Sequence, residues 1–402
     1  MSKTSEETSR ITLERLFFSR TDEQGVIRGA NSVFAYVSDY EMTTMLGAPH
    51  RLVRHDDMPR GVFHLMWDRL RQRLPFGAYV KNLAQDGTHY WVFAVVGPTD
   101  GGYLSVRLKP TSDLLGAVQT LYEGLRKEEH GNKTHPAQSA AALLAALQRL
   151  GHVDYDAFMS AALRAEYSAR ADVLGRPRVK SLEDLARLAS LTSMIAEQAR
   201  KVETVFRSTD QIPYNMRLQA SRMEGSDGPI SVISENHRQM CFAVEGELKR
   251  FKINAASGAQ SIALAEFLNV SSALMDEMAE QFACEEAPAG VDVMKEQTLL
   301  ERLGRSYGSR ASSSLVRFNG EAMKLGRQCR EIRRVVAGLE MTRIMCKIER
   351  GRAKGDPEGL DEIVARLVTA EERLTKALSQ IETAVQDALE VSETLTDLRV
   401  PA

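Results

Sequence analysis

The 402-residue chain has little that would mark it as a membrane or secreted protein. No apolar run approaches the roughly 18 residues that a membrane-spanning helix needs, so we expect no membrane span. The first ten residues, MSKTSEETSR, are polar and contain no signal-peptide core. The four cysteines (Cys241, Cys284, Cys329 and Cys346) are far apart and lack metal-binding spacing. We therefore expect a cytoplasmic protein whose cysteines are buried free thiols.

Sequence signatures of catalysis are also missing. The chain contains no Walker loop and no GxGxxG, GxSxG or HExxH motif. Its 52 basic and 54 acidic residues nearly cancel. This balance gives no reason to expect nucleic acid or an anionic membrane as a general partner. We predict that the protein is not an enzyme.

Aromatic residues are scarce, at 6% of the chain, but they are unevenly spread. Four of the eight histidines and both tryptophans fall between residues 50 and 91. Such a concentration of rings and hydrogen-bonding groups can form a pocket for a flat ligand with polar edges. A packed core with a polar rim would explain the same composition, and both interpretations stay open at this point.

Strand signals are confined to the first part of the chain. Alternating apolar residues predict strands at 79–80, 90–96 and 103–108, and Asp86-Gly87 predicts a hairpin turn. Apolar residues recur with helical spacing from Leu52 to Leu70. After Pro110 almost no strand signal is left. The sequence predicts an α+β domain, an antiparallel sheet with short helices over one face, followed by an all-α bundle or coiled-coil region.

Several short motifs in the first part are specific enough to suggest a family. VRHDDMP (53–59), VKN (80–82) and HYWV (89–92) stand in this order. With their neighbours, they resemble the PAS sensor domain of bacterial aerotaxis receptors over about residues 12–110. Typical receptors of that family carry a membrane anchor after the PAS domain. Because no anchor is visible here, we expect a soluble variant.

The resemblance implies a cofactor and its contacts. In the family, FAD sits in the PAS pocket and its redox state is the signal. The positions that match the family's FAD contacts are Asn31, Arg54, His55, Asp57, Asn82 and Tyr90. Arg54 would then donate a charge-assisted hydrogen bond to an anionic ligand edge, and Trp67 and Tyr90 would wall the site. One position departs from the family, since Phe76 follows Pro75 where the family has a tryptophan.

Two alternatives to this interpretation are kept. Haem is the alternative cofactor, with His50, His55 or His64 as the axial ligand. The alternative function is a scaffold whose PAS pocket is empty and serves only for dimerisation. A visible absorption spectrum distinguishes these possibilities.

We divide the chain into a PAS domain (12–112), a signal helix with linker (113–136) and a helical bundle (137–402). Near the C-terminus, apolar residues recur every seven positions: Leu367, Leu374, Ile381, Ala388 and Leu395. A heptad stripe of this length predicts a bundle or coiled-coil seam, and we expect a homodimer.

Two later stretches, 214–224 and 339–349, align without a gap, and each precedes a glycine-rich turn. We interpret them as repeated tips of helical hairpins, with turns near 225–229 and 351–359. In this interpretation Leu218 and Met223 would occupy the same core positions as Ile344 and Ile348. The first tip, through Ile212, Asn215, Leu218, Ala220 and the sequence ISVI (230–233), is also similar to the hairpin tip of chemoreceptor signalling domains. This similarity implies a degenerate chemoreceptor-like module with chemotaxis-type signalling partners.

Together these observations predict a cytoplasmic PAS-based sensor of redox state, oxygen or a small molecule. The helical region would serve as a non-enzymatic output module that relays the state of the ligand to a partner.

Overall fold

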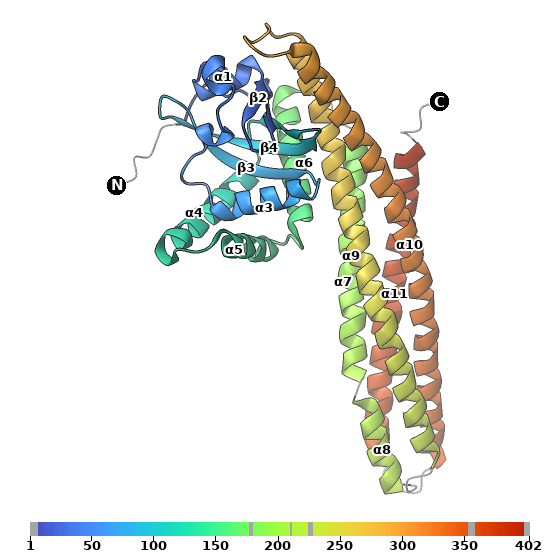
Figure 1. The fold of residues 1–402 in the computed structure, drawn as a ribbon. Coiled ribbons are helices and arrows are strands. Elements are labelled where there is room, and N and C mark those ends of the chain that lie inside the picture. The colour runs from blue at the N-terminus through green and yellow to red at the C-terminus, as the bar shows by residue number, and fades with distance from the viewer. Residues whose placement is uncertain (1–6, 177–179, 210, 224–227, 353–357, 398–402) are drawn as a thin grey trace. The chain divides into compact units, whose positions relative to one another are not determined.

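The computed structural model describes residues 7–176, 180–209, 211–223, 228–352 and 358–397. The chain forms two compact units, each built from two separate segments (Figure 1). The first unit holds Met1–Leu182 and Ala263–Ser313, and the second holds Glu183–Ile262 and Ser314–Ala402. The two longest helices, α9 (Pro229–Ala283) and α10 (Val293–Arg352), contribute residues to both units. The sequence-based limits at residues 112 and 136 stay predictions.

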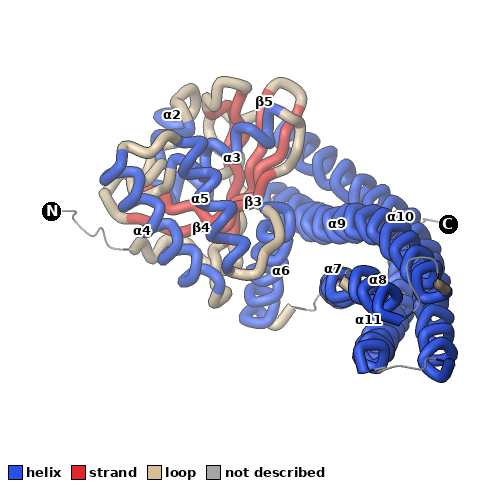
Figure 2. Tube along the Cα trace, turned by 90° about the horizontal axis from the view of Figure 1, so that it is seen from below, coloured by secondary structure: helices blue, strands red, loops and turns tan. Residues whose placement is uncertain are grey.

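A single antiparallel sheet organises the first unit. Its strands are β1 (Phe17–Asp22), β2 (Ile27–Ala30), β3 (Phe76–Leu83), β4 (His89–Thr99) and β5 (Gly102–Leu108). They lie in the order β2-β1-β5-β4-β3, so the first strand pairs with the last. Figure 2 shows the strands gathered in this one sheet. The long connection from β2 to β3 supplies the helices over one face.

This connection contains α1 (Ser32–Ser38), α2 (Met42–Met45), a 3₁₀ turn (His50–Val53) and α3 (Arg60–Arg71). The helical spacing predicted from Leu52 onward is therefore interrupted. Pro59 explains the break, because proline lacks the N–H of a helix interior and disfavours helical geometry in the residue before it. Glu129 accepts hydrogen bonds from the backbone N–H groups of Arg60 (2.7 Å) and Gly61 (3.4 Å), and so closes the free N-terminus of α3.

Three helices follow the sheet: α4 (Leu114–Asn132), α5 (Pro136–Arg149) and α6 (Tyr155–Leu174). Glu166 of α6 is fully buried and accepts hydrogen bonds from the Tyr79 hydroxyl at 2.6 Å and the Ser112 amide at 2.9 Å. These contacts fix α6 to β3 and to the segment that leaves the sheet. A buried carboxylate with this many donors stabilises the arrangement only while all of them are present.

The two faces of the sheet contribute to different apolar clusters, because successive strand residues point to opposite sides. One face, with Phe17, Tyr90 and Val92, packs under the short helices. The other face packs against α6, the end of α9 and the start of α10. Its cluster includes Phe18, Phe93, Val106, Phe267, Phe282 and Tyr307.

Glycines in two strands allow α9 and α10 to approach this second face closely. A Cβ atom on Gly77 would lie 2.6 Å from the Phe267 ring, and one on Gly97 would overlap the Tyr307 hydroxyl. Since real side chains do not tolerate such contacts, the absence of a Cβ at these positions is what admits the aromatic rings. The helices fit because the strands lack side chains there.

The predicted fold class is confirmed: a five-stranded antiparallel sheet with short helices is followed by long helices. The covering of the second sheet face by α9 and α10 was not foreseen, because it joins segments about two hundred residues apart. Within the described ranges, no helix is both long and apolar enough to span a membrane.

The second unit consists of long helices that pack along one another. Among the described residues, three helices lie wholly or almost wholly within it: α7 (Lys180–Thr209), α8 (Ile212–Met223) and α11 (Glu358–Asp397). Helix α11 carries the heptad stripe. All five heptad residues are buried within the unit, including Leu374 at 0% and Leu395 at 1% exposure. The stripe is therefore covered by helices of the same chain, and it does not by itself require a second copy.

Both predicted hairpin turns fall largely outside the described residues, but the helices beside them can be compared. Arg217 pairs with Glu235 at 2.9 Å across α8 and α9. Arg343 pairs with Glu371 at 2.9 Å across α10 and α11. Each of these ion pairs brings its two helices side by side, and the hairpin turns themselves stay predictions.

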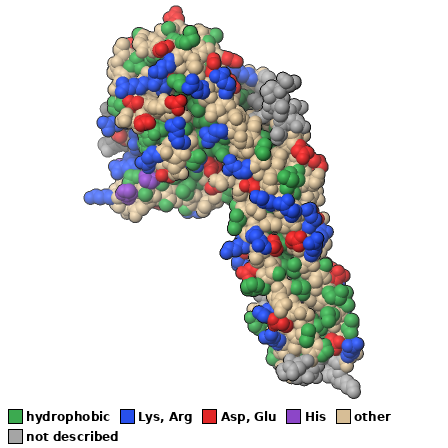
Figure 3. All heavy atoms as spheres, turned by 45° about the vertical axis from the view of Figure 1, so that its right-hand side comes forward, with side chains coloured by type: hydrophobic (Ala, Val, Ile, Leu, Met, Phe, Trp, Pro, Cys, Tyr) green, Lys and Arg blue, Asp and Glu red, His purple; other side chains and the backbone are tan. Residues whose placement is uncertain are grey.

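The proposed repeat between the tips is contradicted by burial. Met216 is fully buried, whereas its predicted equivalent Met341 is 57% exposed. Leu218, Ile344 and Ile348 are also exposed, so they do not form the predicted core positions, and the side chain of Met223 lies outside the described residues. The helices beside the two predicted turns contribute to one shared apolar cluster. The face drawn in Figure 3 shows apolar and charged side chains interspersed along the long helices.

The prediction that all four cysteines are buried is only partly right. All four are free, Cys329 and Cys346 are buried as predicted, and Cys241 is half-buried. Cys284, however, is exposed, because it lies just beyond the end of α9 in the connection to α10. A loop position has fewer covering neighbours than the helical position that its apolar sequence context suggested.

Candidate ligand-binding site

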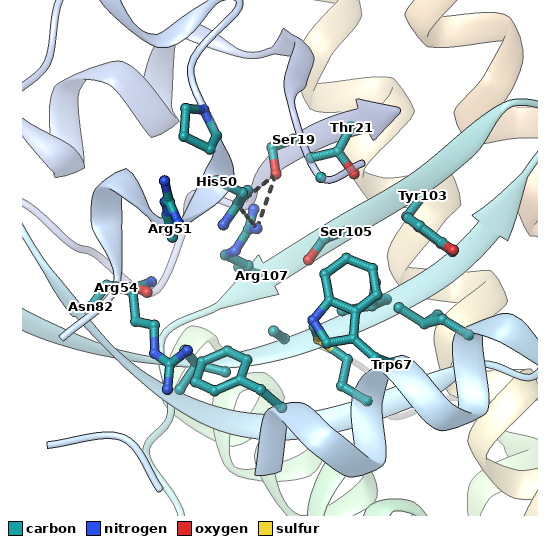
Figure 4. Close-up of a pocket in the computed structure, with 18 of the residues that line it drawn as sticks. Ser19, Thr21, His50, Arg51, Arg54, Trp67, Asn82, Tyr103, Ser105 and Arg107 are labelled. Atoms are coloured by element: carbon teal, nitrogen blue, oxygen red, sulfur yellow. Dashed lines mark hydrogen bonds between the residues drawn. The ribbon is translucent and has the colours of Figure 1, made fainter. Parts of the chain in front are cut away.

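A cavity of about 510 Å³ lies between the sheet and the β2–β3 connection. Its walls come from β1, β3, β4 and β5, from the 3₁₀ turn, and from α3 (Figure 4). This volume is within the range of small-molecule and cofactor sites, roughly 300–1,000 Å³. The cavity combines aromatic and apolar walls with a group of polar side chains on the strands.

Three of these polar side chains meet at one place in the cavity wall. Arg107 of β5 donates from Nη2 to the Ser19 hydroxyl of β1 at 2.9 Å, and the same nitrogen lies 2.7 Å from Nε2 of His50. His50 Nε2 is also 3.1 Å from Ser19 Oγ. Figure 4 shows these side chains converging from two strands and the 3₁₀ turn. Because a guanidinium only donates, His50 Nε2 accepts, and the imidazole proton is assigned to Nδ1.

Arg107 is a buried cation, with 4% exposure. It lies over the rings of Phe34 (4.9 Å) and Phe17 (5.8 Å), which stabilises a cation that has left water. Burial lowers the pKa of Arg107 to about 10, so the group still carries its charge at neutral pH. Its Nη1 atom has no hydrogen-bond partner among the residues that the structure describes.

His50 is neutral at this position. Burial and then the charge of Arg107 lower the pKa of His50 to about 3. Its ring stacks on Phe34 with centroids 5.8 Å apart. A second hydroxyl beside this group, that of Ser105, likewise finds no hydrogen-bond partner in the described part of the chain. The cavity therefore contains a charged donor and a hydroxyl that can both bind an acceptor.

The opposite wall is largely apolar. Trp67 of α3 meets Tyr103 of β5 edge to face, with ring centroids 5.4 Å apart and an angle of 74°. Phe63 stands one helical turn earlier, and the Arg54 guanidinium lies 3.9 Å over its ring. Aromatic side chains of this kind offer a face on which a flat ring can stack. The cavity thus has a stacking wall and a polar strand wall.

Three of the seven residues predicted for the site line this cavity: Arg54, Trp67 and Asn82. Arg54 and Asn82 are also neighbours in the backbone, joined by an isolated antiparallel bridge. Burial lowers the pKa of Arg54, followed by repulsion from Arg126. The structure brings these predicted residues together from three separate segments.

The other four predicted residues lie outside the cavity lining. Asn31 is fully buried at the start of α1, and Tyr90 is fully buried against Phe17, with burial raising its pKa. His55 is half-buried and lies 3.4 Å from the exposed carboxylate of Asp57. Asp57 also pairs with Lys81 at 2.6 Å, and its pKa is lowered by this partner despite partial burial. The FAD contacts that the resemblance assigned to these four positions stay predictions.

Comparison with known proteins found a sequence match over part of the chain. No family model matches the chain. The chain is 38% identical over 122 residues to the aerotaxis receptor of Escherichia coli (strain K12). The match covers 29% of this chain and 24% of the receptor, so the chain spans about a quarter of the length of this curated relative.

Solved structures with similarity to the chain include two LOV domains. The light state of the blue-light photoreceptor Aureochrome1 LOV has 19% identity and a TM-score of 0.24, covering 27% of this chain and 91% of that structure. The LOV domain of the Erythrobacter litoralis EL346 blue-light activated histidine kinase has 15% identity and a TM-score of 0.21, covering 23% and 90%.

The order β2-β1-β5-β4-β3, with helices inserted between β2 and β3, is the strand order of PAS domains. The sequence match to the aerotaxis receptor agrees with this topology. The N-terminal region has the fold of a PAS domain. Its cavity lies where the β2–β3 helices cover the sheet.

The PAS cavity does not fit the alternative cofactor, haem. His55 and His64 do not belong to its lining, which leaves His50 among the predicted axial ligands. The Nε2 atom of His50 already lies 2.7 Å from the Arg107 guanidinium, and a buried cation beside it opposes a bound metal ion.

Sequence reasoning missed the central residues of the PAS cavity: Ser19, Ser105 and Arg107. A signal was present in GYLSVRL (102–108), where Tyr103, Ser105 and Arg107 alternate with apolar residues. In a strand, this period of two places the polar side chains on one face. The polar face of the last strand could therefore have been identified as part of the pocket.

Proposed function

We propose that the chain is a PAS-based sensor whose cavity binds a flat ligand with an acceptor-rich edge, and that FAD is this ligand. One observation carries the proposal: the buried cation Arg107 faces a cavity of about 510 Å³ with a donor that has no partner within the described residues. Leaving such a donor unsatisfied costs roughly 1–3 kcal/mol, and more for a charged group. A bound acceptor removes this cost.

The residues of the cavity fit a flavin. Its ring system is flat and carries carbonyl oxygens and ring nitrogens along one edge, which match the donors of Arg107 and Ser105. The aromatic wall at Trp67 suits the ring faces. A flavin supplies a change of charge at this ring edge when its redox state changes. The resemblance to aerotaxis receptors independently implies FAD.

The electrostatics of the cavity favour a negatively charged ligand edge. Arg107 carries its charge at neutral pH and lacks a carboxylate partner among the described residues. His50 stays neutral beside it, and therefore adds no second charge. Because the site is buried, the attraction between Arg107 and an anion is screened less than at the surface. Redox or oxygen sensing would then act through the charge of the ligand.

Absorption spectroscopy of the purified full-length protein tests the proposal. We expect flavin bands in the purified protein or after incubation with FAD. Arg107→Met should lower the FAD content at least about tenfold, since a buried hydrogen bond to a charged donor contributes about 1.5–3 kcal/mol. Arg71→Met on the exposed side of α3 is the matched control and should retain the wild-type content.

The scaffold alternative predicts a different result. A protein that stays colourless after incubation with FAD contradicts the proposal and favours an empty PAS domain used for association. Wild-type FAD content in Arg107→Met would show that the buried cation is structural. Haemin should keep the absorption spectrum that it has without the protein in either case, because the cavity does not fit haem.

We infer a non-enzymatic output through the long helices, with a homodimer as the working form and chemotaxis-type proteins as partners. The resemblance supports these partners, and exposed apolar residues such as Val316, Met323 and Ile344 on α10 leave a surface for association. Light scattering of the full chain at several concentrations tests the dimer, and a concentration-independent monomer would contradict it. The cytoplasmic location stays a prediction.

A further inference from the structure

Helix α10 has a buried stripe of regularly spaced residues within the second unit. Its members follow one another at alternating intervals of three and four residues, and all are buried: Leu315, Phe318, Ala322, Leu325, Cys329, Ile332, Val336 and Leu339. The thiol of Cys329 lies 3.5 Å from the Leu378 carbonyl oxygen of α11. Alternation of three and four residues is the spacing of a coiled-coil seam. This inner stripe is the face that α10 uses for packing within its own chain.

A second stripe with the same spacing runs along the outer face of α10. Its positions follow at alternating intervals of four and three residues: Val316, Gly320, Met323, Arg327, Arg330, Arg334, Ala337, Met341, Ile344 and Ile348. We call these residues the outer seam. All of them are exposed except Gly320, which is half-buried, and a Cβ on Gly320 would meet no atom within 4 Å. The chain therefore leaves this seam uncovered.

The length of the outer seam exceeds that of a chance patch. From Val316 to Ile348 it extends about 48 Å at 1.5 Å per residue. This is longer than the three to four heptads that indicate a coiled coil. Large apolar side chains lie open to water along it, with Val316 at 59%, Met323 at 53% and Met341 at 57% exposure. A regular row of exposed apolar side chains marks an interaction site.

The chemistry of the outer seam changes along its length. Apolar residues occupy both ends, and three arginines occupy the middle. Arg334 pairs with Glu331 of the same helix at 2.8 Å, whereas Arg327 and Arg330 form no ion pair with any described residue. Figure 3 shows Lys and Arg side chains gathered midway along the long helices, with apolar side chains below them. The middle of the seam is therefore a site for negative charge between two apolar contacts.

This pattern selects the kind of occupant. A facing helix fits the spacing, because the side chains of a seam insert between those of a second helix. A second copy of α10 fits poorly, because the arginines lie near the centre of the seam. Pairing two copies along the whole seam, parallel or antiparallel, would bring arginine against arginine. Opposed like charges at an interface cost several kcal/mol and suppress the wrong partner.

We propose that the outer seam of α10 docks a helix of a partner protein, which carries apolar residues at both ends of the contact and glutamate or aspartate in its middle. The proposal rests on the proposed function in one respect, the role of the long helices as output module, and it names the class of partner. Docking needs no ligand in the PAS cavity. A protein that fails to bind FAD therefore leaves this proposal testable, and loss of docking leaves the flavin proposal intact.

Calorimetric titration of the full chain with two synthetic helical peptides tests the docking. Both peptides have about five heptads with leucine at the seam positions of the outer heptads. One has glutamate at the seam positions of the central heptad, and the other has lysine there. The glutamate peptide should bind at least about tenfold more tightly, since opposite charges meet the arginines. Equal binding of the two peptides, or binding of neither, would overturn the proposal.

A charge reversal assigns the binding to the outer seam. The double variant Arg327→Glu and Arg330→Glu should bind the lysine peptide more tightly than the glutamate peptide. Both positions are exposed, so the fold should be retained, and circular dichroism checks this. Arg187→Glu with Arg200→Glu makes the same change of charge at exposed positions of α7 and should keep the wild-type preference. An unchanged preference in the α10 variant would overturn the proposal, as would a reversal in the α7 control.

The rival occupant, a second copy of the chain, is tested without any peptide. Met323→Glu and Met341→Glu place charges at the two apolar ends of the outer seam. Each should weaken binding of the glutamate peptide at least about tenfold, because a carboxylate then meets leucine. Sedimentation velocity should give the same molar mass for these variants as for the wild type. A smaller species in the variants alone would show that a second copy occupies the seam, and would overturn the proposal.

Discussion

The two faces of the five-stranded sheet differ, although the same strands build both. The cavity face carries Ser19, Ser105 and Arg107, with polar atoms that lack partners within the described residues. The helix face carries aromatic and aliphatic side chains that pack against α6, α9 and α10. A folded domain retains unsatisfied polar groups where a ligand can meet them, and fills the opposite face to gain stability. The comparison therefore separates binding from stability within one sheet.

The largest expected effect comes from opening the packed face. Phe282→Ala should lower the free energy of unfolding by about 3–5 kcal/mol, because it leaves a hole beside Phe18. The matched change on the cavity face, Phe63→Ala, should cost less than about 2 kcal/mol, since that ring is already partly exposed. Urea denaturation of both variants measures the difference. Equal losses would contradict the separation of the two faces.

A smaller loss of stability is expected when a side chain is added on the packed helix face of the sheet. In Gly97→Ala the new methyl group overlaps the Tyr307 hydroxyl, and overpacking of this kind costs about 1–3 kcal/mol. Gly116→Ala in α4 is the control, because a Cβ there meets open space and should stabilise the helix by about 0.5–1 kcal/mol. Melting temperatures should move in opposite directions. A neutral Gly97→Ala would mean that α10 does not lie against β4 as described.

The cavity face should respond to pH. The folded pKa of His50 is about 3, below its ordinary value of 6.5, so the unfolded chain binds more protons between these values. The stability contributed by neutral His50 is thus present at pH 7 and is lost as the pH falls below 6.5. The expected loss is about 1 kcal/mol at about pH 5.5. The urea midpoints of the wild type and of His50→Asn, each measured at pH 7 and at about pH 5.5, give the contribution of His50 to stability. An equal shift of the midpoint with pH in the two proteins would contradict the prediction.

The smallest effect on stability is expected at the rim of the cavity. Arg54→Ala removes a partly exposed cation from over the Phe63 ring and should cost no more than about 0.5–1 kcal/mol. Its effect on FAD content should be larger than this cost, because the guanidinium lines the site. Thermal denaturation gives the loss of stability, and the flavin-to-protein absorbance ratio of the same sample gives the FAD content. A variant that unfolds yet keeps its flavin ratio would make Arg54 structural.

Local sequence patterns were sufficient for β3, β4 and β5, but β1 and β2 were not predicted as strands. Alternation in 90–96 and 103–108 and the turn residues Asp86-Gly87 depend on neighbours a few positions away, and these elements formed as predicted. The start of α3 is also determined by local sequence, because Pro59 fixes where the helix begins. The heptad stripe of α11 likewise predicted which of its residues are buried.

Tertiary structure decided which residues meet. Arg54, Trp67 and Asn82 line one cavity. Asn31 does not line it, and its side chain donates instead to Glu285, more than two hundred residues later in the chain. No local pattern in the sequence specifies such a pairing. The stripe of α11 could equally have faced a second chain, and only packing within the second unit assigned it to the same chain. The physical reason is that periodicity fixes the face a side chain occupies, whereas its partner depends on which distant surface buries the most apolar area and satisfies the remaining polar groups.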